Sequence, residues 1–334
     1  MATARQLTSL LRSHSQRDDE QFRVVALQIA AAEARAGHEN LALEIQKIIQ
    51  NRIPQKLEQQ LPATSQAHPL QHSLPISRPQ GELANLIDAV EPSVGLGQMV
   101  LTPSLRIRLG RIVKEQQHFT RLREHGLRPR QRILLLGPPG CGKTMTAHAL
   151  AHDLGLPLFI VRLDSLFTKY LGETTAKIRV VFDAIERHRA VYLFDEFDSL
   201  GLSRGAQHDV AEMRRVLNSL LVFVDNLRGH SLLIAASNHP EALDSALFRR
   251  FDDILTYRPP TLVELDRLLR ARLSGEDTKN FDWKLIIKAA QGLSFAEASR
   301  AADEAIKERL IEHSERLTTE MITRAIKERG KHRR

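Results

Sequence analysis

Residues 132–144 read Arg-Ile-Leu-Leu-Leu-Gly-Pro-Pro-Gly-Cys-Gly-Lys-Thr, an apolar segment that runs directly into a glycine-rich loop. Residues 137–144 fit the pattern G-x-x-x-x-G-K-S/T, and a helical run over 145–154 follows. Glycines let such a loop curl with its N–H groups toward phosphate oxygens, and the following helix presents its positive end to the anion. The stretch predicts a strand, a phosphate-binding loop and a helix that together bind a nucleoside triphosphate.

Each side chain of the loop has an expected role. Lys143 supplies a positive charge for the β- and γ-phosphates, and the Thr144 hydroxyl is expected to bind Mg²⁺. The residues expected to contact the nucleotide here are Gly137, Pro138, Pro139, Gly140, Cys141, Gly142, Lys143, Thr144 and Met145. Cys141 is the chain's single cysteine, which excludes an internal disulfide and suits a reducing cytosol.

Composition indicates a soluble cytoplasmic protein with no membrane segment. The 334 residues are 42% hydrophobic and 26% charged, and no apolar run reaches the length of about 18 residues needed to span a bilayer. The net charge of +8 raises nucleic acid as a partner. Basic residues crowd the segment 106–132 and the tail 327–334, but no aromatic residues interleave with them. Solvated helix faces are therefore favoured over a nucleic-acid surface.

The chain divides into four parts by composition. Residues 1–53 have apolar residues at helical spacing and predict a small helical docking module, and residues 54–98 are rich in Pro, Gln, Ser and His and predict a flexible linker. Residues 99–258 alternate helices and strands, which predicts a parallel sheet of five strands with helices on both faces. Residues 259–334 predict a helical subdomain with a basic tail.

The expected elements follow from periodicity. The strands are expected at 132–136, 158–162, 191–195, 232–236 and 253–257. The helices between them are expected at 104–126, 143–154, 174–188 and 207–226. Four more helices are expected at 261–273, 282–291, 295–312 and 318–329.

Polar residues at the ends of two further strands complete the expected site. Asp195 and Glu196 end an apolar strand, where Asp195 is placed to hold Mg²⁺ and Glu196 to deprotonate the attacking water. Asn238 follows the next strand and is expected to bind the γ-phosphate or the same water. Further along, Arg249 and Arg250 precede Phe251 and Asp252, and such arginines neutralise charge on a transferring phosphoryl group, from a neighbouring subunit in some enzymes.

These motifs, in this order, resemble the AAA family of ATPases over about residues 99–330. The Arg-Arg-Phe form is similar to that of the severing and membrane-remodelling members. The resemblance implies ATP and Mg²⁺ as cofactors, a ring that is usually a hexamer, and Arg249 and Arg250 acting on the neighbour's ATP. It also implies that Lys169, Tyr170 and Leu171 form a pore loop that grips a polypeptide, and that the lid residue Ala296 lies near the adenine.

The chain departs from the family at three places. The family's adenine segment ahead of the first helix is altered, and Gln98-Met99-Val100-Leu101 is expected to take its place. The lid reads Phe295-Ala296-Glu297 where the family often has Gly-Ala-Asp. No arginine stands at the place of the family's sensor arginine, and Arg300, one turn later, is expected to be structural. The N-terminal helices resemble those of small bacterial AAA ATPases encoded beside a subtilisin-like serine protease, so the resemblance raises such a protease as a partner. The expected function is a motor that remodels, unfolds or threads protein, or regulates a partner. A nucleic-acid remodeller or loader and a slow nucleotide-gated switch are the alternatives.

Overall fold

The computed structural model describes residues 79, 81–92, 94–166, 171–200, 207–314 and 316–331. The chain divides into two compact units, Met1–Pro69 and Leu70–Arg334, and every described residue belongs to the second. The predicted docking module of residues 1–53 and most of the predicted linker therefore lie outside the described residues, as does the end of the basic tail.

A six-stranded sheet forms the centre of residues 81–258, with the order β1-β3-β4-β5-β2-β6. The strands are β1 (Ile87–Val90), β2 (Arg132–Leu136), β3 (Leu158–Val161), β4 (Val191–Phe194), β5 (Leu232–Ser237) and β6 (Asp253–Thr256). The last five are the predicted ones, and they pair in parallel. The mixed α/β fold with a largely parallel sheet is thus confirmed.

The sixth strand corrects the prediction. Strand β1 pairs with β3 in antiparallel fashion at the edge of the sheet, with Ile87 opposite Val161. It lies within residues 54–98, which were expected to be a flexible linker with periodicity only over residues 83–90. Leu86 and Ile87 are buried in the core beside β3, and the ion pair between Asp88 and Arg162 joins the two strands. The sheet thus has six strands instead of five, and one of them is not parallel.

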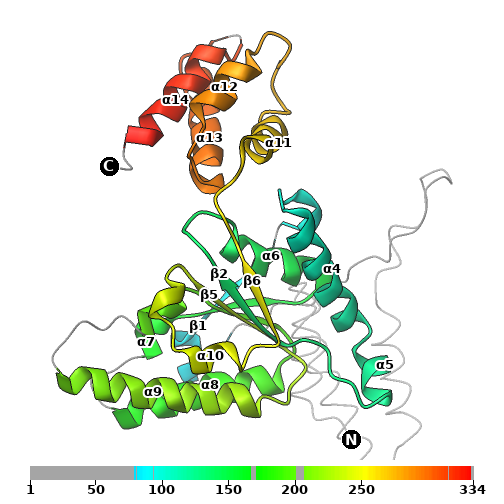
Figure 1. Ribbon diagram of the computed structural model, residues 1–334, viewed down its shortest axis with the longest axis vertical. Coiled ribbons are helices and arrows are strands. Elements are labelled where there is room, and N and C mark those ends of the chain that lie inside the picture. The colour runs from blue at the N-terminus through cyan, green and yellow to red at the C-terminus, as the bar shows by residue number, and fades with distance from the viewer. Residues whose placement is uncertain are drawn as a thin grey trace, which may run out of the picture. The chain divides into compact units, whose positions relative to one another are not determined.

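Helices cover both faces of the sheet (Figure 1). Helices α8 (Leu171–Arg187) and α9 (Gln207–Asn226) pack on the face that carries Leu134 and Leu136. Helices α4 (Pro103–Gln117) and α6 (Lys143–Leu154) pack on the face that carries Ile133 and Leu135. Because successive residues of a strand point to opposite faces, the uninterrupted apolar run of β2 fills both cores.

Shorter elements connect these layers. They are η1 (Gly81–Asn85), η2 (Leu96–Gln98), α5 (Phe119–Glu124), α7 (Leu163–Leu166), η3 (Phe197–Leu200), η4 (Pro240–Ala242) and α10 (Ser245–Phe248). The single helix expected over 104–126 is two helices, because the backbone of His118 leaves the helical region, with φ −99° and ψ 25°, where α4 ends and α5 begins.

The C-terminal residues form a four-helix lid with its own apolar core. Its helices are α11 (Leu262–Arg272), α12 (Trp283–Ala289), α13 (Phe295–Ile311) and α14 (Thr319–Lys331), close to the predicted ranges. Two of them begin with a capping box: Thr261 and Glu264 start α11, and Ser294 and Glu297 start α13. Such reciprocal capping satisfies the free N–H groups of a first helical turn and fixes where the helix begins.

Candidate active site

The phosphate loop lies between β2 and α6, at the carboxyl end of the parallel strands. Gly137, Gly140 and Gly142 have φ values of 141°, 73° and 98°, which L-residues with a side chain rarely adopt. The N–H of Gly137 donates to the Ser237 carbonyl at 3.2 Å, which ties the first residue of the loop to the end of the neighbouring strand β5. Gly142 caps α6 without any side-chain hydrogen bond, which leaves the first N–H groups of the helix for an anion.

Lys143 is directed into this loop and is only 6% exposed. Its Nζ donates to the carbonyls of Gly137 at 2.6 Å and Pro138 at 2.9 Å, and to Asn238 Oδ1 at 2.8 Å. All three acceptors are neutral, so within the described part of the chain no carboxylate bonds directly to this ammonium. Burial lowers the pKa of Lys143, with the charges of Cys141, Asp195 and Asp198 opposing that shift. A phosphate is the kind of partner that this ammonium fits.

Thr144 and Asp195 are brought together across the loop. The Thr144 hydroxyl donates to Asp195 Oδ2 at 2.6 Å, which places two oxygen ligands side by side at the end of β4. Mg²⁺ is usually held by one or two carboxylate or hydroxyl oxygens together with water and phosphate oxygens. The two residues fit that ion, and they would hold it beside the phosphates.

Glu196 follows Asp195 in a turn with an unusual backbone. Its φ is 49°, and its N–H donates to Asp195 Oδ1 at 2.9 Å. Non-glycine residues in the left-handed region are uncommon, and they tend to occur at functional sites. The turn buries the next side chain, Phe197, and leaves Glu196 exposed beside the loop. That exposure suits a base that must reach a water molecule.

Asn238 is fixed by a carboxylate that the sequence-based prediction missed. Asp198 is 6% exposed, and its Oδ1 accepts the backbone N–H of Asn238 at 3.0 Å. Asn238 in turn accepts from Lys143. Asp198 thus links the segment that follows β4 to the segment that follows β5. The signal was present in the sequence, since Asp198 lies three residues after Asp195 and one helical turn can place both on the same side.

The lid touches the loop at Gly140. The N–H of Ala296, at the start of α13, donates to the Gly140 carbonyl at 3.1 Å. A Cβ on Gly140 would lie 2.6 Å from Ser294 Oγ, so the approach is close. Arg300 is exposed, and its charge acts on Glu304 one turn further along α13. Ala296 therefore lies beside the phosphate loop, and its expected place near the adenine stays a prediction.

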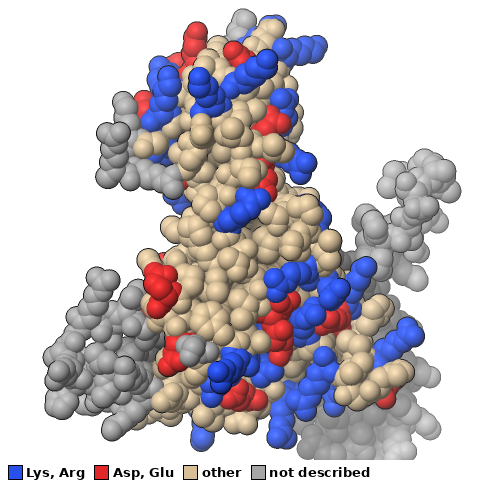
Figure 2. All heavy atoms as spheres, in the orientation of Figure 1, with Lys and Arg blue, Asp and Glu red and all other residues tan. Residues whose placement is uncertain are grey.

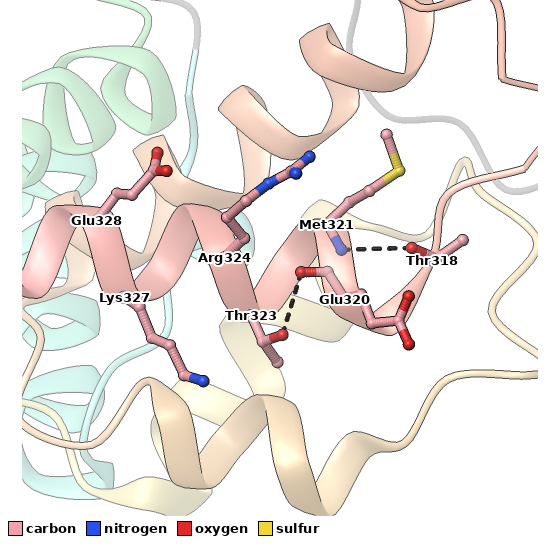
Figure 3. Close-up of a pocket in the computed structure, with 7 residues that line it drawn as sticks. All are labelled: Thr318, Glu320, Met321, Thr323, Arg324, Lys327 and Glu328. Carbon is pink, nitrogen blue, oxygen red and sulfur yellow. Dashed lines mark hydrogen bonds between the residues drawn. The ribbon is translucent and has the colours of Figure 1, made fainter.

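Other predicted residues are placed as follows. Cys141 is buried, Pro139 is exposed, and Met145 is 48% exposed at the start of α6. Lys169 and Tyr170 of the predicted pore loop lie outside the described residues, and Leu171 is the first residue of α8. A hollow on the lid, bounded by the loop before α14 and by α14 itself, is shown in Figure 3. None of the predicted site residues lines it.

Arg249 and Arg250 lie apart from the loop. Arg249 is exposed, whereas Arg250 Nε donates to Asp225 Oδ2 at 2.7 Å and its Nη1 donates to the Ala246 carbonyl at 2.9 Å. The backbone N–H of Asp252 donates to the Arg132 carbonyl, at the amino end of β2. The arginine pair therefore lies near the amino end of the parallel strands, opposite to the carboxyl end that carries the phosphate loop.

Comparison with known proteins gives the family. Residues 133–259 match the family described as ATPase family associated with various cellular activities (AAA). An uncharacterized AAA family ATPase of Sinorhizobium fredii, y4kL, is 36% identical over 334 residues, which is 100% of this chain and 97% of that protein. The chain belongs to the AAA family. It is accordingly an ATPase, as the resemblance of its motifs implied.

Two other relatives of this AAA protein cover less of its length. A proteasome-activating nucleotidase of Pyrococcus abyssi is 34% identical over 199 residues, which is 57% of this chain and 50% of that protein. An ATP-dependent zinc metalloprotease FtsH of Mycoplasmopsis synoviae is 35% identical over 193 residues, which is 55% of this chain and 29% of that protein. The shared part is thus half or less of each of those two relatives. Among the described helices of the AAA protein, none combines the length and apolarity that crossing a bilayer requires.

The loop glycines provide a direct test of the site. A Cβ on Gly137 would lie 2.4 Å from the Tyr257 carbonyl oxygen, a backbone atom, at a φ of 141°. We expect Gly137→Ala to introduce about 1–3 kcal/mol of strain. If the strain is relieved only when the loop loses its ATP-binding geometry, ATP affinity falls about 5- to 150-fold. Binding of a fluorescent ATP analogue and thermal unfolding measure the two effects.

The matched control is Gly110→Ala in α4, where a Cβ meets nothing within 4 Å. That change should stabilise the protein by about 1 kcal/mol and leave ATP affinity unchanged. Unaltered ATP binding by the Gly137→Ala protein would show that the loop does not depend on this close contact.

Proposed function

We propose that this ATPase works as a ring, with six copies as the expected number, in which each active centre is shared between two copies. Hydrolysis would be Mg²⁺-dependent and would drive the remodelling, unfolding or threading of a protein, or the regulation of a partner protein. A cytoplasmic location is part of the proposal. The observation that carries it is the position of the arginine pair relative to the chain's own phosphate loop.

The separation between the arginine pair and the phosphate loop of the same copy follows from the strand register. Strands β2 and β6 run parallel, with Ile133 beside Asp253 and Leu136 beside Thr256. Arg249 and Arg250 precede β6, whereas the phosphate loop follows β2, so the length of a strand separates them. At about 3.3 Å per residue, the five residues of β2 span roughly 16 Å, which is longer than an extended arginine side chain. The arginine pair is therefore better placed to reach the ATP of a neighbouring copy than its own.

The two arginines differ in the partners of their side chains. Arg250 is tied to Asp225 in the last turn of α9, and its side chain is 29% exposed. Arg249 is exposed, and no interaction of its side chain is observed with the described residues. We therefore assign the phosphate contact across the interface first to Arg249. Arg250 would have to break its ion pair with Asp225 before it could bind a phosphate. In the alternative, this ion pair stabilises the segment that carries Arg249.

Roles within one copy follow from the contacts described above. Lys143 would bind the β- and γ-phosphates, and Thr144 and Asp195 would hold Mg²⁺, which supplies positive charge against the phosphate oxygens when bound. Glu196 would take the proton of the attacking water, and Asn238 would orient that water or the γ-phosphate. Asp198 would hold Asn238 in position through its backbone N–H.

A protein substrate is supported by the names of two relatives. One is called a proteasome-activating nucleotidase and the other an ATP-dependent zinc metalloprotease, and both names join a nucleotide to a protease. We infer that the present chain also acts on protein. An extended polypeptide would be gripped by the predicted pore loop, which consists of Lys169, Tyr170 and Leu171. The helices of residues 1–53 would recruit the substrate or a partner, and a subtilisin-like protease is one such partner.

The charge distribution argues against the nucleic-acid alternative. Figure 2 shows acidic side chains among the basic ones on this face of the molecule. Four of the nine cations of residues 106–132 are used within the chain: Arg106 bonds the Met99 carbonyl, Arg108 pairs with Asp253, Arg130 with Glu115 and Arg132 with Asp252. Fewer of these positive charges are therefore available to nucleic-acid phosphates than the sequence alone indicates. The slow nucleotide-gated switch stays an alternative that turnover measurements decide.

Tyr170→Ala tests the choice of substrate. Removing an aromatic anchor costs about 2 kcal/mol or more, so we expect the concentration of unfolded casein that half-stimulates ATP hydrolysis to rise about thirty-fold or more. Basal hydrolysis should stay near the wild-type rate. Equal stimulation of both proteins by casein would contradict the threading role. Steeply salt-dependent stimulation by DNA, with none by casein, would favour the nucleic-acid function.

A further inference from the structure

A pair of buried hydroxyl groups connects the end of β6 to the phosphate loop. Tyr257 follows β6 directly, just before the connection to the lid, and is 4% exposed. Its OH lies 2.6 Å from the Oγ1 of Thr146, which is fully buried in the first turn of α6. Thr146 Oγ1 also lies 2.9 Å from the Gly142 carbonyl oxygen. Three groups from two distant segments therefore form one hydrogen-bonded chain.

The direction of these hydrogen bonds is fixed by chemistry. A carbonyl oxygen only accepts, so Thr146 must use its single hydroxyl hydrogen on Gly142. The Tyr257 OH is then the donor to Thr146 Oγ1. Burial raises the pKa of Tyr257 to about 12, so the phenol keeps its proton at neutral pH. The relay runs from Tyr257 through Thr146 to the residue that precedes Lys143.

The backbone of Tyr257 reaches the other end of the same loop. Its N–H donates to the Leu136 carbonyl at 2.7 Å, and its carbonyl oxygen occupies the space where a Cβ of Gly137 would lie. Tyr257 therefore contacts the first glycine of the loop through its backbone and holds the last through Thr146. Gly142, with its φ of 98°, has no side chain of its own to fix its orientation.

We propose that Tyr257 is a positioning residue for ATP binding, which acts through Thr146 to hold the Gly142 end of the phosphate loop. When the relay is intact, the N–H groups that follow Gly142 keep one orientation toward the phosphates. Without the phenol hydroxyl, Thr146 Oγ1 no longer accepts a hydrogen bond from Tyr257, and the Gly142 end of the loop becomes more mobile. The binding of ATP must then restrict this motion, which lowers the affinity. The proposal rests on residues 137–144 being the nucleotide site and does not depend on the ring.

The test measures the affinity of the full-length protein for a slowly hydrolysed ATP analogue with Mg²⁺, together with thermal unfolding. We expect Tyr257→Phe to weaken analogue binding about three- to ten-fold, the usual effect of one lost hydrogen bond. Thr146→Val should cause a similar loss, because it removes the middle of the relay. The double variant should bind no more weakly than the weaker single variant, since both changes break the same chain. Thr146→Ser keeps the hydroxyl and should bind as wild type.

The matched control is Tyr192→Phe. Tyr192 is also buried in the sheet, at 1% exposure, and its OH donates to the carbonyls of Ala184 and His188, away from the loop. That variant should lose thermal stability and keep its affinity for the analogue. Wild-type affinity in Tyr257→Phe, or losses that add in the double variant, would overturn the proposal. If Tyr257→Phe does not fold, Thr146→Val decides: it must bind more weakly than Thr146→Ser, or the proposal fails.

Discussion

Glu196→Gln is expected to lower the rate of ATP hydrolysis by about 10²–10⁴-fold, the usual contribution of a general base. The amide keeps the size of the side chain and its place in the turn at φ 49°, but it cannot accept the proton of the attacking water. Because Lys143, Thr144 and Asp195 are unchanged, the affinity for ATP should stay within a few-fold of wild type. Phosphate release and binding of a fluorescent ATP analogue measure the two quantities separately.

Glu328→Gln on α14 is the matched control, since it is exposed on the lid hollow and far along the chain from the loop. It should hydrolyse ATP as wild type. If Glu196→Gln releases phosphate at the wild-type rate, another group takes the proton, and the assignment of the base is wrong. A large loss of ATP affinity would instead mean that Glu196 supports the loop.

Arg249→Ala is expected to reduce hydrolysis by about 10³–10⁵-fold, the range seen when an arginine that stabilises phosphoryl transfer is removed. Arg249 is chosen over Arg250 because Arg250 holds Asp225 and the Ala246 carbonyl, so its removal also disturbs the local structure. Affinity for ATP and the mass of the particle with a slowly hydrolysed analogue should be preserved. Arg249→Lys should recover little activity, since lysine lacks the planar fork of donors.

Arg179→Ala, an exposed arginine on α8, is the control and should hydrolyse ATP normally. Full activity of the Arg249→Ala protein would exclude Arg249 as the catalytic cation. In that case Arg250→Ala, compared with Asp225→Asn, would show whether the second arginine has that role after leaving its carboxylate.

Short motifs with a fixed local geometry were predictable from the sequence. The phosphate loop needs glycines at positions of positive φ and a lysine six residues after the first glycine, and both requirements are local. The same holds for the five parallel strands, whose apolar runs are bounded by polar residues. Their predicted bounds differ from the observed ones by no more than a residue at each end, as at Leu158–Val161 and Leu232–Ser237.

Features that depend on pairing between distant residues were not predictable. Strand β1 is four residues long and lies in a Pro- and Gln-rich stretch, so its place at the sheet edge depends on pairing with β3. The link from Asp198 to Asn238 joins residues 40 apart, and that from Thr146 to Tyr257 joins residues 111 apart. The spacing of apolar and polar residues along the sequence does not indicate such contacts. The contact from Asp198, however, fixes the backbone of Asn238, one of the predicted catalytic residues.

The shared active centre is tested most directly by mixing two inactive proteins. Glu196→Gln chains keep Arg249, and Arg249→Ala chains keep Glu196, so an interface between the two kinds can contain one complete set of catalytic groups. Each protein alone should be inactive, and we predict that the mixture, after exchange of subunits, hydrolyses ATP at a substantial fraction of the wild-type rate. A mixture that stays as inactive as its components, although mass measurement shows mixed rings, would contradict catalysis across the interface.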